Sequence, residues 1–210
     1  MRILGIDPGY AIVGWGVIEH GGNTFRTLDY GAITTAAGGE FTARLETIYR
    51  DMCRLLQAAK PDAMAIEKLF FNTNTTTAIM VAEARGVILL AARQMGVPVY
   101  EYTPLQVKQA VTGYGRAEKH QIQEMTKMLL HLEKIPKPDD TADALAVAIC
   151  HGHSSGSALS RVQMLQKAGE YNTGGNRATA FTESGLKIRS SWGGSMKGID
   201  LTQAKGNKRR

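Results

Sequence analysis

The sequence predicts an α/β fold of three layers, in which helices cover both faces of a mixed β-sheet. The first supporting observation is an opening series of strand-like segments, two of which are separated by the turn residues Gly21-Gly22-Asn23. The second is an alternation of helical and strand-like segments in the rest of the chain. Strands joined by a tight turn pair antiparallel, whereas strands separated by helices pair parallel, so the predicted sheet contains both kinds.

The first half of the chain supplies three strands and one helix. Ile3–Ile6 is a continuous apolar run followed by Asp7 and two turn residues, which is typical of a buried strand. Further on, apolar residues recur at steps of three and four with charges between them, which indicates an amphipathic helix. The two other strands and this helix are expected at residues 11–19, 24–34 and 40–59.

The second half alternates strands with helices. Ala63–Glu67 is a short apolar run and, like the first strand, it leads into an acid. Gly96 and Pro98 open another strand-like run, which reaches Tyr102. The remaining helices are expected at residues 74–95, 103–111, 119–132 and 140–151.

The composition is that of an ordinary globular chain. With 210 residues, 43% of them hydrophobic, the chain can bury one core and carry a tail. No stretch approaches the roughly eighteen continuous apolar residues of a membrane span, and the N-terminus lacks the pattern of a signal peptide. Cys53 and Cys150 are far apart and form no metal-binding pair, so we expect free thiols in a cytoplasmic protein.

The excess of positive charge is confined to the C-terminal part of the sequence. Residues 154–210 carry ten lysines and arginines against three acids, whereas residues 1–153 carry fifteen against sixteen. We therefore expect a folded domain at 1–153 and a basic, Gly/Ser-rich tail at 154–210 that is disordered, because it has few apolar residues to bury. Such a tail could tether DNA through counterion release or could have no role, and both alternatives stay open.

Four acids are candidates for a single site, namely Asp7, Glu67, Asp140 and Asp143. The first two end predicted strands, and the last two are three residues apart, so that on a helix they share one face. Structural alternatives exist, because Asp7 could cap a turn and the helix pair could cap a helix N-terminus. Together, however, the four acids suit hard divalent cations such as Mg²⁺, with Mn²⁺ able to replace it. Two such ions can hydrolyse a phosphodiester by activating water and stabilising the leaving oxygen.

Six short motifs accompany these acids in a fixed order. They are Gly5-Ile-Asp-Pro-Gly9, Ala65-Ile-Glu67, Ala84-Arg-Gly86, Gln106-Val-Lys108, Ala117-Glu-Lys119 and Ala142-Asp-Ala-Leu-Ala146. On these motifs, residues 2 to about 153 closely resemble the RuvC-type Holliday-junction resolvases, which are crossover junction endodeoxyribonucleases of the ribonuclease-H-like superfamily. The resemblance implies a three-layer ribonuclease-H-like fold with a five-stranded mixed sheet.

The resemblance also implies an activity and the residues that perform it. The family resolves four-way DNA junctions by cutting two strands of like polarity, in recombination and repair. It acts as a homodimer and with the RuvA-RuvB branch-migration complex. Its catalytic acids, which hold two metal ions per subunit, correspond to Asp7, Glu67, Asp140 and Asp143. Its residues that contact the DNA backbone or stack on a base correspond to Lys108, Lys119 and Phe70.

The predicted helix at 74–95 is apolar nearly all round, whereas a surface helix needs only one apolar stripe. One face should cover the sheet, and the small residues Ala78, Ala82 and Ala84 would let another helix approach closely. The resemblance implies that this other helix belongs to a second subunit. A helix buried wholly inside one subunit is the alternative.

The chain departs from the family pattern at three places. Residues 72–77 are polar and uncharged, whereas many members carry one or two lysines there. The absence of these lysines removes positive charge near the junction centre. Glu83 stands where a glutamine is common. The tail is unusually long.

Two other classes of function are weighed against a junction nuclease. A junction-binding scaffold that has lost catalysis would lack one of the acids, and none is missing. An actin-like kinase or ATPase would share the Gly5–Gly9 motif, but it needs two such domains and a second nucleotide motif. As isolated residues, the two lysines could be ordinary surface residues and Phe70 a core residue. The pair His151 and His153 is interpreted as polarity at a helix end rather than as a metal site.

Overall fold

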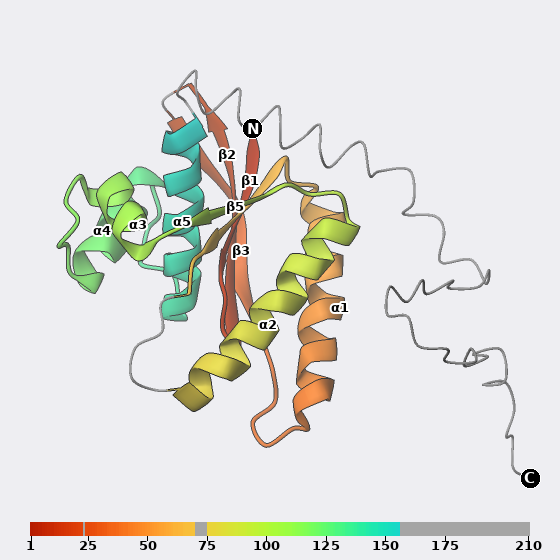
Figure 1. Cartoon of the computed structure of the whole chain (residues 1–210). Helices are drawn as coiled ribbons and strands as arrows, with labels where there is room; N and C mark the ends of the chain where they lie inside the picture. Colours follow the sequence, from red (N-terminus) through yellow and green to blue (C-terminus); the bar gives the residue numbers. More distant parts are fainter. Residues whose placement is uncertain (23, 70–74, 156–210) are drawn as a thin grey trace, which may run out of the picture. The chain divides into compact units, whose positions relative to one another are not determined.

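A five-stranded mixed sheet lies at the centre of the fold, with strand order β3-β2-β1-β4-β5 (Figure 1). The computed structural model describes residues 1–22, 24–69 and 75–155. The strands are β1 (Arg2–Asp7), β2 (Ile12–Gly21), β3 (Thr24–Thr34), β4 (Ala63–Glu67) and β5 (Val99–Tyr102). The helices are α1 (Phe41–Ala59), α2 (Thr75–Gln94), α3 (Pro104–Thr112), α4 (Lys119–Leu129) and α5 (Asp139–Ser155).

Strand β1 occupies the middle of the sheet because its side chains are apolar on both faces. Ile3 and Ile6 are fully buried, as strands covered on both faces require. The strand pairs antiparallel with β2 and parallel with β4, with Ile6 opposite Ile66. Because β1 and β4 run in the same direction, the acids at their C-terminal ends, Asp7 and Glu67, lie at the same end of the sheet.

The helices form a layer on each face of the sheet, as the sequence predicts (Figure 1). On one face, α1 and α2 pack side by side, and Ile48, Met52 and Ile88 are fully buried in the core beneath them. On the other face, α5 packs against the sheet through Leu145 and Ile149, and α3 and α4 pack against α5. The predicted α/β fold, with a five-stranded mixed sheet and helices on both faces, is confirmed.

The backbone of helix α5 packs directly against the backbone of the sheet, because three glycines of the sheet face the helix. A methyl group on Gly5 would collide with the carbonyl oxygen of Ala144, and one on Gly14 would collide with the carbonyl oxygen of Asp140. A methyl group on Gly16 would collide with a side chain of the same helix. The missing Cβ atoms therefore decide how closely the start of α5 approaches β1 and β2.

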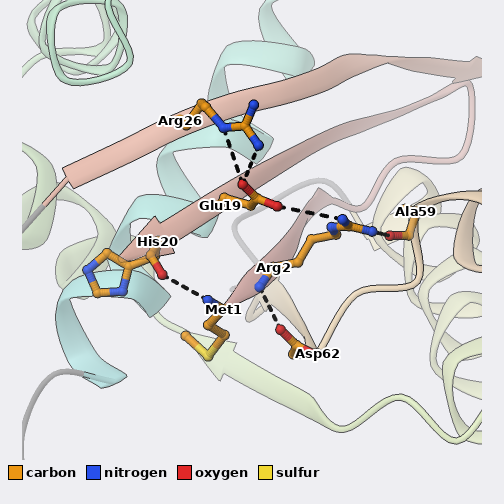
Figure 2. A network of polar contacts seen from close by, with 7 residues as sticks. All are labelled: Met1, Arg2, Glu19, His20, Arg26, Ala59 and Asp62. Atoms are coloured by element: carbon orange, nitrogen blue, oxygen red, sulfur yellow. Dashed lines mark hydrogen bonds and ion pairs between the residues drawn. The ribbon is translucent and has the colours of Figure 1, made fainter. Parts of the chain in front are cut away.

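A polar network holds the beginning of β1, at the end of the strand opposite Asp7 (Figure 2). The backbone N–H of Arg2 donates to Asp62 Oδ2 at 2.7 Å, and its guanidinium donates to the Ala59 carbonyl oxygen at 2.6 Å, at the C-terminus of α1. Glu19 on β2 lies between Arg2, at 3.6 Å, and Arg26 on β3, at 2.5 Å. The network thus joins three strands to the end of α1.

The predicted bounds differ from the structure mainly where the backbone leaves the helical or extended conformation. Helix α4 ends at Leu129 rather than at residue 132, because His131 has a positive φ of 51°, which a right-handed helix does not contain. Strand β5 begins at Val99 rather than at the preceding glycine, since Gly96 has a φ of 71°. Helix α5 continues to Ser155, beyond the predicted domain boundary at 153.

Two predictions concern residues that the structure does not describe. Phe70 falls within 70–74, and the predicted tail falls within 156–210 except for its first two residues, which belong to α5. The expectations for Phe70 and for the tail therefore stay predictions. In the part of the chain that the structure describes, no helix is long and apolar enough to cross a membrane.

Replacing Gly14 with alanine should push α5 away from the sheet, because the new methyl group would overlap the carbonyl oxygen of Asp140. We expect a loss of about 1–3 kcal/mol in the free energy of unfolding, the usual cost of overpacking. Urea denaturation measures this loss. Gly21→Ala is the matched control in the same strand, because a methyl group there meets nothing within 4 Å. Equal losses in the two variants would contradict the close approach of α5.

Candidate active site

Four acids converge at the end of the sheet where the C-termini of β1 and β4 lie. Two of them are the last residues of those strands and two lie at the start of α5, and this acid cluster consists of Asp7, Glu67, Asp140 and Asp143. Thr141 fixes the first turn of α5 here, because its hydroxyl donates to the carbonyl oxygen of Gly31 on β3 at 3.1 Å. The structure therefore brings together the four acids that the sequence analysis singles out.

Repulsion within the acid cluster is most evident at Asp7. Burial is the largest cause of its raised pKa, which reaches about 8. The neighbouring carboxylates add to the rise in the order Asp143, Glu67 and Asp140, and the Lys119 ammonium offsets only part of it. A bound cation would supply the positive charge that this carboxylate lacks.

The pKa values of Glu67 and Asp143 are also raised, and burial is again the largest cause. The charge of Asp143 raises the pKa of Glu67 further, whereas Lys108 and Lys119 oppose the rise. Lys119 likewise opposes the rise at Asp143, through a hydrogen bond and through its charge. These acids and the two lysines therefore share one electrostatic neighbourhood.

Lys119, the first residue of α4, neutralises part of the acid cluster. Its Nζ lies 3.1 Å from Asp143 Oδ2 and 3.6 Å from Asp139 Oδ2. Burial lowers the pKa of Lys119, but its hydrogen bond to Asp143 and the nearby acidic charges outweigh burial, so the pKa is raised. Asp139 is shared with Lys137, whose Nζ lies 2.6 Å from Asp139 Oδ1. The ion pairs of Lys119 join α4 to the start of α5.

A cavity of about 200 Å³ lies beside the acid cluster. Its polar lining consists of Glu67, Asp143, Lys108 and Lys119. Its apolar lining consists of Pro104, Val107, Ile122 and Ala146. Both lysines that are predicted to contact DNA thus line the same space as two of the acids, so a phosphate could meet ammonium groups beside carboxylates.

The chemistry of the acid cluster fits a hard divalent cation. Carboxylate oxygens are ligands that Mg²⁺ prefers, and a bound cation would offset the burial and the mutual repulsion that raise the pKa values of these acids. Across residues 1–22, 24–69 and 75–155, no three histidine, cysteine or acidic side chains are gathered tightly enough to hold a metal ion as they stand. The pairing of Lys119 with Asp143 offers a physical reason, because the ammonium takes up a carboxylate oxygen that a metal ion would need.

Arg85 on α2 lies next to the acid cluster, although the sequence analysis assigns it no role. Its Nε donates to the carbonyl oxygen of Glu67 at 3.4 Å, and its guanidinium forms an ion pair with Glu101 on β5. Its side chain is only 16% exposed. In the sequence, Arg85 stands out only as the centre of the Ala84-Arg-Gly86 motif, and no local pattern indicates its contact with Glu67.

The two histidines near the end of α5 contact different parts of the sheet. His151 is fully buried, with its Nδ1 2.7 Å from the hydroxyl oxygen of Tyr102 on β5. His153 is exposed and its ring meets Phe25 on β3, at the opposite edge of the sheet. The two rings therefore point to opposite edges of the sheet. His151 is a core residue, whereas the sequence analysis interprets the pair as polarity at a helix end.

The sheet order, the parallel pairing of β1, β4 and β5, and the helices on both faces define a ribonuclease-H-like protein. Two solved structures support this class. The RuvC structure from Thermus thermophilus matches with a TM-score of 0.69 and 36% sequence identity, over 74% of this chain and 95% of that chain. T. thermophilus RuvC in complex with a Holliday junction substrate also gives a TM-score of 0.69, with 38% identity over 72% of this chain and 92% of that chain.

Sequence comparison narrows the class to one family. The family described as crossover junction endodeoxyribonuclease RuvC matches residues 3–151. A relative of that name from Brevibacillus brevis is 63% identical over 151 residues, which are 72% of this chain and 91% of the relative. The chain therefore belongs to the crossover junction endodeoxyribonuclease RuvC family, and the expected family and fold are confirmed.

Asp7→Asn should weaken the dependence of stability on pH in the absence of divalent cations. The pKa of Asp7 is about 8 in the folded protein and about 3.9 in an unfolded chain, so the folded state binds the proton more tightly. The stability that this proton contributes is fully present below about pH 4 and is lost as the pH rises toward the folded value, by at most about 1.4 kcal/mol per pH unit. Asparagine has no such proton to lose.

Thermal unfolding in a chelator, at about pH 5 and about pH 8, measures this effect. The wild-type protein should lose more stability than Asp7→Asn between the two pH values. At the higher pH, the variant should be the more stable of the two proteins. An equal loss of stability in both proteins would show that the pKa of Asp7 is not raised in the folded protein.

Proposed function

We propose that this member of an endonuclease family resolves four-way (Holliday) DNA junctions in homologous recombination and DNA repair. It does so by paired, metal-dependent hydrolysis of phosphodiester bonds in two strands of like polarity. The observation that carries the proposal is the meeting of four acids from β1, β4 and α5 beside a cavity lined by Lys108 and Lys119. The similarity to T. thermophilus RuvC, which was solved with a Holliday junction substrate, supports the choice of DNA.

In this proposal, the acid cluster provides the metal ligands. The four carboxylates hold Mg²⁺, with two ions per subunit, and Mn²⁺ can replace it. When bound, the ions activate the attacking water and stabilise the leaving oxygen. The contribution of the chain is to hold oxygen ligands from two strand ends and one helix in fixed relative positions. The raised pKa of Asp7 supports this role, because the positive charge of a cation would offset the effects of burial and of the neighbouring carboxylates that raise it.

The two lysines bind the phosphates of the DNA backbone. Lys108 and Lys119 both line the cavity beside Glu67 and Asp143, where a phosphate would have to lie to meet the bound metal. A cation held by Asp143 would displace Lys119 from that carboxylate, and the Lys119 ammonium would then be available to the phosphate. Phe70 follows Glu67 by three residues and stacks on a base at the junction centre, a contact worth about 1–3 kcal/mol.

The protein acts as a homodimer through the outer face of α2. Ile79 and Leu90 are 60% and 51% exposed, and with Ala82 and Gly86 they follow each other at steps of three and four along one side of the helix. Gly86 is exposed, and a methyl group there would meet nothing within 4 Å. Large apolar side chains beside small residues allow two helices to pack closely. Ala84, which the sequence analysis also assigns to this contact, is instead fully buried in the core of the subunit. An isologous dimer would present one acid cluster to each of two equivalent DNA strands.

The resemblance to the family supports a wider setting for the proposed activity. The protein acts in the cytoplasm with the RuvA-RuvB branch-migration complex. The basic residues of 154–210 tether DNA without sequence preference. An inactive junction-binding scaffold is a weaker candidate, because it gains nothing from buried carboxylates whose mutual repulsion destabilises the fold.

Each of four substitutions should abolish cleavage of a mobile four-way junction, namely Asp7→Asn, Glu67→Gln, Asp140→Asn and Asp143→Asn. Each keeps the shape of the side chain and removes the charge that holds the ion. The loss of cleavage activity should exceed the roughly 10–100-fold loss that follows mutation of residues that only orient the metal ligands. Junction binding should persist, because a negative charge near the DNA backbone is removed. Cleavage assays and gel-shift titrations measure the two properties.

Asp139→Asn is the matched control for this series. Asp139 contacts Lys119 and Lys137, and its side chain is 43% exposed, so cleavage should change little. Cleavage within about tenfold of wild type in any of the four acid variants would remove that residue from the metal ligands. A larger loss for Asp139→Asn than for Asp140→Asn would show that the wrong acid of the pair is assigned.

Ala82→Arg should convert the dimer into monomers that keep their fold. The substitution places a long charged side chain between Ile79 and Gly86 on the proposed contact face. Paired incision of junctions should be lost, because one subunit reaches only one strand. Light scattering measures the size, and circular dichroism checks the fold. Gln57→Arg, at an exposed position of α1, is the control, and a stable dimer of Ala82→Arg would exclude this face as the interface.

A further inference from the structure

The peptide group between Glu67 and Lys68 is held from two sides. The backbone N–H of Lys68 donates to the carbonyl oxygen of Tyr102 on β5 at 2.8 Å. The carbonyl oxygen of Glu67 accepts from Arg85 Nε at 3.4 Å. This peptide therefore has one partner on the neighbouring strand and one on α2, although it lies at the very end of β4, where strand pairing stops.

Arg85 is itself fixed by a second contact. Its guanidinium pairs with Glu101 on β5, which lies opposite Ile66 in the register of the two parallel strands. The arginine side chain is 16% exposed and the glutamate side chain is 41% exposed, so the pair is partly shielded from water. A guanidinium presents several N–H donors in one plane, so a single arginine can bind a carbonyl and a carboxylate together.

We propose that Arg85 is a positioning residue for Glu67, which it holds as a metal ligand by binding the Glu67 carbonyl oxygen and bracing itself on Glu101. This inference rests on the proposed function of the acid cluster. Repulsion from Asp143 tends to drive the Glu67 side chain away from the site, and a backbone fixed on both sides limits that movement. Arg85 also joins Glu67 to α2, whose outer face we propose as the dimer contact.

Direct titration of Mn²⁺ in the absence of DNA tests the inference, by calorimetry and by electron paramagnetic resonance. Arg85→Met keeps most of the apolar stem and removes the donors. It should weaken Mn²⁺ binding by about 10–100-fold, the usual effect of losing a residue that orients a ligand. In cleavage assays, the Mn²⁺ concentration for half-maximal rate should rise by a similar factor. Arg54→Met is the control, because Arg54 also pairs with an acid but lies on α1.

A charge-exchanged double variant separates positioning from simple stabilisation. Arg85→Glu combined with Glu101→Arg restores an ion pair between α2 and β5, but position 85 can no longer donate to the Glu67 carbonyl oxygen. Its free energy of unfolding should return toward the wild-type value, while Mn²⁺ binding stays weak. Recovery of both properties would overturn the inference, because the ion pair alone would then suffice.

Further outcomes decide the remaining cases. If Arg85→Met does not fold, Arg85→Lys replaces it, since a lysine keeps the charge for Glu101 but not the planar set of donors. Mn²⁺ binding within about twofold of wild type in the folded variant would refute the inference, as would a wild-type protein that binds no Mn²⁺. A wild type that binds Mn²⁺ but does not cut four-way junctions would refute the proposed function alone.

Discussion

The site depends on the contact between α5 and the sheet, which only residues without a Cβ atom permit. Gly5 and Gly14 leave room for the carbonyl oxygens of Ala144 and Asp140, so the helix backbone rests directly on β1 and β2. Side chains at the start of α5 then reach the end of the sheet where the parallel strands β1 and β4 end. With larger residues at these positions, α5 would lie farther out and its two acids would not meet those of the strands.

The placement of four acids at one end of the sheet has an electrostatic cost that shapes the rest of the site. Burial and neighbouring charges raise the pKa of Asp7 to about 8, and Lys119 offsets part of the repulsion by pairing with Asp143. Arg85 holds the backbone of Glu67 against the same repulsion. A protein selected for stability alone would remove one of these charges, so the strain is consistent with a cation and a phosphate as the intended occupants.

The sequence predicts the parts of this arrangement whose signals are local. Strand runs that lead into acids identify Asp7 and Glu67, and helical spacing pairs Asp140 with Asp143. Contacts between segments far apart in the sequence have no such local signal, because they depend on how the helices and strands pack against one another. The pairing of Lys119 with an acid of α5, the binding of Arg85 to a strand end and the clearance at the glycines facing α5 are of this kind. The early end of α4 depends on one residue with a positive φ.

The position of bound Mn²⁺ in crystals of the protein, located by its anomalous scattering, tests this account most directly. We predict Mn²⁺ within bonding distance of Asp7 and of carboxylates from both β4 and α5. In the same crystals, Lys119 Nζ should have moved away from Asp143 Oδ2, from which it is now 3.1 Å. Mn²⁺ bound elsewhere, or bound while the pair of Lys119 and Asp143 stays intact, would contradict the account.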